Sequence, residues 1–306
     1  MDEVFEHPAL FYRGPAEYVR ETVGFLRAGL AAGEPVAAAV PGPNLALIEA
    51  GLGRDAPDVL LLDMTEAGRN PGRIIAKVLH GFADAHPGRR VRIIGEPIWA
   101  GRTALEYPAC AQHEALINAA FAGRAMTILC PYDQSRLAPR VLADARITHP
   151  DIMDAGRREV SADYDWQAVV DRYNEPLTAP PQARTFAFAA PELRAVRHFA
   201  VERAAGLGLA GSRLQDAELA VEELAANSVV HGGGSGTFAI WAEAGQVVCQ
   251  VRDHGTMPDP LAGRRPAAPG QLGGRGLLLV HYIADLVRVH TSAAGTTIRC
   301  YLDIGN

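Results

Sequence analysis

Three polar residues near the end of the chain have a spacing that suits phosphoryl transfer. Glu223, Asn227 and His231 are spaced i, i+4 and i+8, so they lie along one face of a helix predicted over 212–231. An asparagine carbonyl can bind Mg²⁺, and a carboxylate one turn away can accept a proton from a water or hydroxyl beside it. The alternative is a polar stripe that faces solvent.

Two glycine-containing segments follow this helix, and each suits a part of a nucleotide. Asp253, directly after an apolar strand pattern, could accept a hydrogen bond from an exocyclic amine, and Gly255 would let a flat ring approach the backbone. Segment 273–276, Gly-Gly-Arg-Gly, stands at the start of another predicted helix, where free amides and the helix dipole favour a phosphate. Each pattern alone is weak, because aspartate and glycine form turns in many proteins.

The elements that would carry these residues predict a two-layer α+β unit over 184–306. Ser212 is expected to cap the long helix, and Ala244 with Gly245 to close a hairpin. The predicted order is strand 185–189, helices 191–207 and 212–231, strands 237–243 and 246–252, helix 275–284, and strands 286–290 and 296–304. This order predicts a mixed sheet with all its helices on one face.

The preceding part of the chain has a different pattern, which predicts an α/β sandwich with a mostly parallel sheet over residues 1–150. Continuous apolar strands separated by helices are typical of a parallel sheet that is covered on both faces. The predicted strands are 35–40, 59–63, 91–95 and 126–131, and the predicted helices are 44–50, 71–85 and 109–120. Residues 151–183 are polar and end in several prolines, so they are predicted to be a linker with one helix at most.

The composition excludes several classes of protein. The 306 residues carry a net charge of −6 without a basic patch, so neither nucleic acid nor a membrane surface is an expected partner. No apolar run approaches the roughly 18 residues of a membrane span. The four cysteines form no C-x-x-C pair, which favours reduced thiols and a cytoplasmic location.

Lys77 is the only lysine in the chain, and its surroundings exclude two kinds of nucleotide site. A P-loop needs a glycine directly before its lysine, and no glycine precedes Lys77. The segment 74–77, Ile-Ile-Ala-Lys, resembles the lysine strand of protein kinases only weakly, since no glycine-rich loop precedes it. Lys77 is therefore expected to be a solvated helix residue.

Taken together, the motifs of the second unit resemble the GHKL ATPase superfamily, which includes gyrase, the MutL repair proteins, histidine kinases and anti-sigma kinases. The resemblance rests on E-x-x-x-N at 223–227, D-x-G at 253–255, G-x-G at 274–276 and Gly-Thr-Thr at 295–297, and it spans about 184–304. It implies the Bergerat ATPase fold with ATP and Mg²⁺ as ligands. The lid departs from the family pattern at 256–260, Thr-Met-Pro-Asp-Pro, and at 264–266, Arg-Arg-Pro.

The same resemblance implies a role for each matching residue. Glu223 would be the general base and Asn227 the magnesium ligand, while Asp253 would read the adenine ring. The other implied nucleotide contacts are His231, Gly255, Gly273, Gly274, Arg275, Gly276 and Thr296.

Within the superfamily, the short second unit resembles the stand-alone anti-sigma-factor serine kinases. Such a kinase phosphorylates a serine or threonine on a STAS-type anti-anti-sigma partner and holds a sigma factor. Two alternatives stay open: a non-catalytic ATP-binding anti-sigma regulator, and an atypical histidine kinase. The second is weaker, because neither His113 nor His198 lies in a typical phospho-acceptor motif.

The first unit resembles the MEDS sensory domain over about 5–149. The resemblance rests on 7–12 (His-Pro-Ala-Leu-Phe-Tyr), 95–97 (Gly-Glu-Pro) and 129–133 (Leu-Cys-Pro-Tyr-Asp), and it implies a RecA-like or flavodoxin-like fold without a P-loop. This resemblance is compatible with a small-molecule signal that binds the first unit and with a homodimer of the chain.

Several residues of this unit could line a ligand pocket at the strand ends, although each aromatic among them could equally belong to the core. These residues are Tyr12, Glu96, Trp99, Glu106, Tyr107, Cys110 and His113. Cys110 and His113, spaced i and i+3, could also contact a metal or haem, but a buried thiol is the more common explanation.

Overall fold

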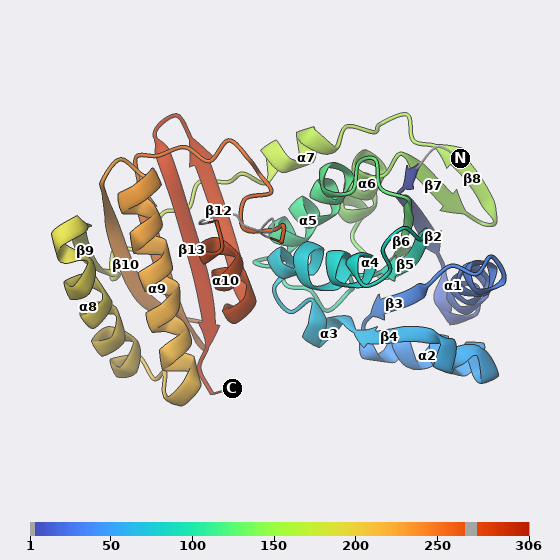
Figure 1. Cartoon of the computed structure of the whole chain (residues 1–306), viewed down its shortest axis with the longest axis horizontal. Helices are drawn as coiled ribbons and strands as arrows, with labels where there is room; N and C mark the ends of the chain where they lie inside the picture. The colour runs from blue at the N-terminus through green and yellow to red at the C-terminus, as the bar shows by residue number, and fades with distance from the viewer. Residues whose placement is uncertain (1–3, 267–273, 306) are drawn as a thin grey trace. The chain divides into compact units, whose positions relative to one another are not determined.

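The computed structural model describes residues 4–266 and 274–305, and the chain divides into two compact units, Met1–Tyr173 and Asn174–Asn306 (Figure 1). No helix in these ranges has both the length and the apolar character needed to cross a membrane. Each unit has its own sheet and its own core.

The first unit is an α/β sandwich whose eight described strands form one sheet, which confirms the predicted fold class. The strand order is β4-β3-β5-β6-β2-β7-β8, with β1 also paired to β6, and only the β7–β8 pairing is antiparallel. The strands are β1 (Phe5–Glu6), β2 (Pro8–Tyr12), β3 (Val36–Val40), β4 (Val59–Asp63), β5 (Val91–Gly95), β6 (Met126–Asp133), β7 (Asp151–Asp154) and β8 (Arg157–Val160). Every residue of β3 is buried, as expected for a strand covered on both faces.

The helices of this unit include the predicted ones over 44–50 and 109–120 and others that were not predicted, and an irregular stretch replaces the predicted helix over 71–85. They are α1 (Gly14–Ala31), α2 (Gly42–Leu52), α3 (Met64–Ala67), α4 (Gly81–Asp84), α5 (Tyr107–Ala120), α6 (Pro139–Thr148) and α7 (Trp166–Arg172). The helix predicted over 71–85 is instead a 3₁₀ turn (Pro71–Arg73), a π-helical segment (Ile75–His80) and the short α4. Lys77 lies in the π-helical segment.

The segment 151–183, predicted to be a linker, contains β7, β8 and α7. The strand β7 pairs with β2, and Ile152 on it is fully buried. Tyr173 directly follows α7, and its hydroxyl donates a hydrogen bond to Asp144 on α6. These contacts explain why the boundary between the units falls after Tyr173 and not near residue 150.

The second unit has two layers, with a five-stranded sheet of order β12-β13-β11-β10-β9 under α8, α9 and α10 (Figure 1). Its elements are β9 (Arg184–Ala189), α8 (Leu193–Gly206), α9 (Gly211–His231), β10 (Ser235–Glu243), β11 (Gln246–Asp253), α10 (Gly276–Ile283), β12 (Leu286–Ser292) and β13 (Gly295–Asp303). The core lies between the layers, where Leu224 on α9 packs with Val251 on β11 and Ile298 on β13. The long helix begins after Ala210, so the predicted Ser212 cap is wrong.

The prediction of a mixed sheet is wrong, because all four pairings in this sheet are antiparallel. Two helices in succession, α8 and α9, connect β9 to β10 and bring the chain back in the opposite direction. The single helix α10 between β11 and β12 leaves these two strands running the same way. They are not neighbours, however, because β13 lies between them and pairs antiparallel with both.

Glu96, directly after β5, is a buried carboxyl group in the first unit. Asn44 Nδ2 lies 2.9 Å from both carboxylate oxygens of Glu96, and the Tyr18 hydroxyl donates to Oε2 at 3.1 Å. The Tyr12 ring packs on Tyr18 at 4.8 Å between centroids. Burial raises the pKa of Glu96 from 4.5 to about 8, although the hydrogen bonds from Asn44 and Tyr18 oppose this rise.

The raised pKa of Glu96 predicts a pH-dependent stability of the first unit. Between about pH 4.5 and about pH 8 the folded state holds a proton that the unfolded chain has lost, so the free energy of unfolding falls as pH rises through this window. Glu96→Gln keeps the shape without titrating, so its stability should decrease less from pH 5 to pH 8. Urea denaturation at both pH values measures this, with the exposed Glu49→Gln as control. Equal pH dependence in wild type and Glu96→Gln would contradict the prediction.

Candidate functional site

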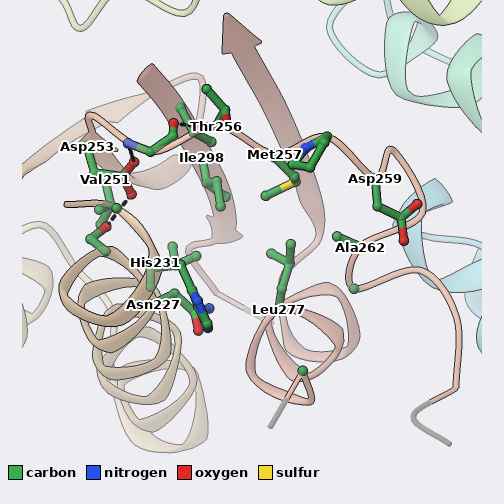
Figure 2. A pocket seen from close by; sticks show the side chains of 18 residues that line it. Asn227, His231, Val251, Asp253, Thr256, Met257, Asp259, Ala262, Leu277 and Ile298 are labelled. Atoms are coloured by element: carbon green, nitrogen blue, oxygen red, sulfur yellow. Dashed lines mark hydrogen bonds between the residues drawn. The ribbon is translucent and has the colours of Figure 1, made fainter. Parts of the chain in front are cut away.

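A cavity of about 340 Å³ opens in the second unit between α9, the loop after β11, and α10 (Figure 2). Its walls are mostly apolar: Leu224, Val251, Met257, Leu277 and Ile298 line it. Figure 2 shows Asn227 and His231 on α9, with Leu277 on the facing helix. An apolar cavity with a few polar groups is typical of a site for a small organic ligand.

Asp253, the last residue of β11, lies in this cavity with its carboxylate fixed by two donors. The Ser228 hydroxyl donates to Oδ2 at 2.7 Å, and the Gly255 amide donates to Oδ1 at 2.9 Å (dashed lines in Figure 2). Each oxygen keeps a further lone pair for a ligand donor. The role of Ser228 was not predicted, because Ser228 lies outside the stripe formed by Glu223, Asn227 and His231. The signal was a hydroxyl in an otherwise apolar stripe.

Gly255 allows the loop after β11 to approach the end of α9. A Cβ at this position would overlap the carbonyl oxygen of His231, so any larger residue would push the loop away. The Thr296 hydroxyl donates to the Gly255 carbonyl at 2.8 Å, and the sheet register places Thr296 opposite Asp253. Thr291, which sequence reasoning missed, contacts Thr296 Oγ1 at 2.9 Å and accepts from the Met257 amide at 3.0 Å.

Glu223 and Asn227 lie against the first residue of α10. A Cβ at Gly276 would overlap Glu223 Oε2 and would lie 3.5 Å from Asn227 Nδ2. Only glycine therefore permits this approach of the α10 N-terminus to α9. Both side chains are half-buried. A carboxylate and an amide thus meet the helix end that attracts anions.

The structure brings most of the predicted residues together, and the remaining ones lie as follows. The cavity is lined by Asn227, His231, Asp253, Gly255, Gly274 and Thr296. Arg275 is exposed at the N-cap position of α10. Gly273 lies outside the described residues.

The residues predicted to form a pocket in the first unit make contacts in several groups: Tyr12 and Glu96 share Tyr18, and Trp99 and Glu106 share Arg102. Trp99 stacks under the Arg102 guanidinium at 4.0 Å, and Glu106 accepts from the same group at 2.8 Å. The Tyr107 hydroxyl donates to Asp144 at 2.7 Å, which makes it a core contact. Two further residues are buried on α5: Cys110 and His113.

Two family models match the chain, one for each unit. Residues 6–150 match MEDS, the methanogen/methylotroph DcmR sensory domain, and residues 186–302 match the histidine kinase-like ATPase domain. The chain therefore consists of an N-terminal MEDS domain and a C-terminal histidine kinase-like ATPase domain, which confirms both resemblances.

Two solved structures are similar to part of the chain. One contains the RsbU and RsbW domains of a Mycobacterium tuberculosis protein; it is 23% identical, with a TM-score of 0.31, and the match covers 40% of this chain and 33% of that one. The chain thus matches a third of that structure's length. The other is the Acinetobacter baumannii histidine kinase AdeS, with 13% identity and a TM-score of 0.25. This match covers 41% of this chain and 70% of AdeS. No curated protein matches the chain.

The contact at Gly276 predicts that even one added methyl group will damage the site. Gly276→Ala should displace the Glu223 carboxylate or the α10 N-terminus and weaken ATP binding by about 1–3 kcal/mol, the usual cost of overpacking. The control is Gly206→Ala, where a Cβ would meet open space. Calorimetric titration with Mg-ATP measures both variants. Full ATP affinity in Gly276→Ala would show that this approach does not shape the site.

The two hydrogen bonds of Asp253 predict how its substitution acts. An asparagine would turn a donor toward either Ser228 or Gly255, so the side chain could no longer offer two fixed acceptors. Asp253→Asn should therefore weaken ATP binding about 10-fold to 100-fold. Ser228→Ala, which removes only a supporting bond, should cost less. The assignment of Asp253 fails if calorimetry gives the same ATP affinity for wild type and Asp253→Asn.

Proposed function

We propose that this chain is an ATP-dependent protein serine/threonine kinase of the anti-sigma-factor type, controlled by its MEDS domain. The substrate is a serine or threonine on a STAS-type anti-anti-sigma protein, and the kinase unit also holds a sigma factor. The single observation behind this proposal is the position of Glu223, a half-buried carboxylate beside Asn227 at the N-terminus of α10.

The cavity supports ATP as the phosphoryl donor. Asp253 presents a fixed carboxylate that can accept from the exocyclic amine of adenine, between the apolar walls formed by Val251 and Ile298. Gly274 and the start of α10 supply backbone amides for the phosphates. These groups lie at different parts of one cavity, as the base and phosphates of a nucleotide require.

The residues at the phosphate end suit Mg²⁺. The Asn227 amide lines the cavity, and its uncharged oxygen can bind Mg²⁺ together with substrate phosphates and waters. The ion would neutralise charge on the phosphate oxygens. Asn227 would hold it in position, while Glu223 stays free for the substrate.

Glu223 would act as the general base of the transfer. Its carboxylate accepts the proton of the incoming hydroxyl as the hydroxyl oxygen bonds to the γ-phosphorus and the bond from that phosphorus to ADP breaks. Because Glu223 is half-buried and not enclosed, a side chain on another protein can reach it. A protein hydroxyl is therefore a suitable acceptor.

The two alternatives have less support. A non-catalytic ATP-binding regulator has no need for a carboxylate beside the metal ligand. A histidine kinase needs an accessible acceptor histidine, but His113 is only 1% exposed within α5. His198 is exposed on α8, where it contacts Arg194, but it does not lie in a typical phospho-acceptor motif. We also propose a cytoplasmic location, because the four cysteines are buried thiols outside any disulfide, as expected under reducing conditions.

The proposed base predicts a separation of binding from catalysis. Glu223→Gln keeps the size of the side chain but cannot accept the proton, so ATP affinity should persist while phosphotransfer falls about 10²–10⁴-fold. Transfer of labelled phosphate from ATP to a STAS-type partner measures the rate. The matched control is Glu222→Gln, because Glu222 is exposed and faces Arg197 at 3.3 Å, away from the cavity.

The outcomes separate the three functions. An unchanged rate in Glu223→Gln would remove the proposed base. Labelled phosphate on a histidine of the chain would favour the histidine kinase. ATP binding without any transfer to a partner serine or threonine would favour the non-catalytic regulator.

A further inference from the structure

Four buried side chains with metal-binding atoms converge inside the MEDS domain. They are His7, Glu114, Cys130 and His149, and their donor atoms all lie within 4.8 Å of one another. Each of these residues is at most 1% exposed. None belongs to the ATP cavity, and none is among the residues that sequence reasoning chose for a ligand site.

The fold of the first unit places these residues together from four different elements. His7 lies between β1 and β2, both of which pair with β6, and Cys130 is on β6. Glu114 is on α5, and His149 directly follows α6. The cluster therefore joins the N-terminal strands to the centre of the sheet and to two helices.

The hydrogen bonds of His7 determine which of its ring nitrogens carries the proton. Asn118 Nδ2 donates to the carbonyl oxygens of Thr148 at 2.8 Å and Ala115 at 3.1 Å, and this fixes the orientation of the Asn118 amide. The other amide atom, Oδ1, is therefore the oxygen, which can only accept. That oxygen lies 3.2 Å from His7 Nδ1, which must therefore donate. In the neutral ring, Nε2 then carries a bare lone pair, 3.4 Å from Cys130 Sγ and 3.5 Å from Glu114 Oε2.

His149 is oriented in the same way. Its Nδ1 lies 2.8 Å from the carbonyl oxygen of Ala145, which can only accept, so Nδ1 carries the proton. Nε2 of the neutral ring then faces Glu114 Oε2 at 3.1 Å. Histidines that bind metals usually donate their second ring nitrogen to a carbonyl or carboxylate in this way. Both imidazoles are thus held as metal ligands are held.

The cluster has more acceptors than donors. A carboxylate can only accept, so in their neutral forms both imidazoles present lone pairs to Glu114. Neither Glu114 oxygen accepts a hydrogen bond of good geometry from the described residues, although both oxygens are buried and the Tyr132 hydroxyl is a further donor that interacts with this carboxylate. A cation at the centre would satisfy all these lone pairs.

We propose that His7, Glu114, Cys130 and His149 form a tetrahedral Zn²⁺ site. Metal–ligand bonds of about 2.0–2.3 Å in a tetrahedron place neighbouring donor atoms about 3.3–3.6 Å apart. The separations from His7 Nε2 are 3.5 Å to Glu114 and 3.4 Å to Cys130, within this range, and His149 Nε2 lies slightly closer to Glu114, at 3.1 Å. Two imidazoles, a thiolate and a carboxylate suit Zn²⁺ among common divalent ions.

Four protein ligands leave no open position, so the zinc is structural. Such sites bind their metal as the chain folds, because the ligands come together only in the folded state. Here the ion would fix the N-terminal segment, through His7, to β6 and α5. The competing arrangement has no metal: His149 is protonated and donates to Glu114, and the Cys130 thiol donates to His7.

The test uses the full chain, purified without a histidine tag, with Zn²⁺ and Co²⁺ as probes. Elemental analysis should give about one zinc per chain, as expected for a single structural site with four protein ligands. After removal of zinc with a chelator, Co²⁺ should give the visible bands of tetrahedral coordination and a thiolate charge-transfer band. Removal of the metal should also lower the unfolding temperature of the first unit.

Variants identify the ligands. The charge-transfer band should disappear in Cys130→Ser and remain in Cys110→Ser, which changes another buried cysteine of the same unit. Because the spectrum of the unaltered chain already reports a thiolate ligand, the test does not depend on the folding of Cys130→Ser. Zinc content near zero together with no Co²⁺ spectrum would overturn the proposal and favour the hydrogen-bonded network. Loss of the band in Cys110→Ser would also overturn it.

Discussion

The hydrogen bond between Ser228 on α9 and Asp253 at the end of β11 fixes the helix layer to the sheet at the cavity. It positions the carboxylate, and the carboxylate in turn holds the Gly255 amide, so the following loop leaves the sheet in one direction. The approach of Gly276 to Glu223 brings the N-terminus of α10 against α9, next to Asn227, which lines the cavity. The positions of the polar groups that would bind the adenine ring and the phosphates therefore depend on how closely α9 packs against β11 and α10.

Local patterns predicted the elements of this site well. The helix 212–231 and the strand 246–252 lie within a residue or two of α9 and β11, because the apolar spacing and the glycines that end each element are local signals. The antiparallel sheet was missed because the insertion of β13 between β11 and β12 is a long-range event. The same reason applies to Ser228 and Thr291, whose partners Asp253 and Met257 lie 25 and 34 residues away along the chain.

In the first unit, too, local sequence patterns did not predict contacts between residues that lie far apart along the chain. Cys110 and His113 drew attention as a metal pair because they are close in sequence, yet the buried donor set consists of four residues spread from His7 to His149. No local pattern joins them, since the parallel sheet brings β2 beside β6 across more than a hundred residues. Glu96 was chosen as a candidate pocket residue because it directly follows a strand, where parallel sheets gather polar groups, and the structure shows that it is buried.

A comparison of ATP with GTP tests the central claim, a nucleotide site read by Asp253, most directly. The fixed carboxylate can accept from the amine of adenine, whereas guanine carries a carbonyl oxygen at the corresponding ring position and would place two acceptors together. Calorimetric titration of the full chain should give ATP binding at least about tenfold tighter than GTP binding, and this difference should shrink in Asp253→Asn. Equal affinity for ATP and GTP, or no binding of either in the presence of Mg²⁺, would contradict the account.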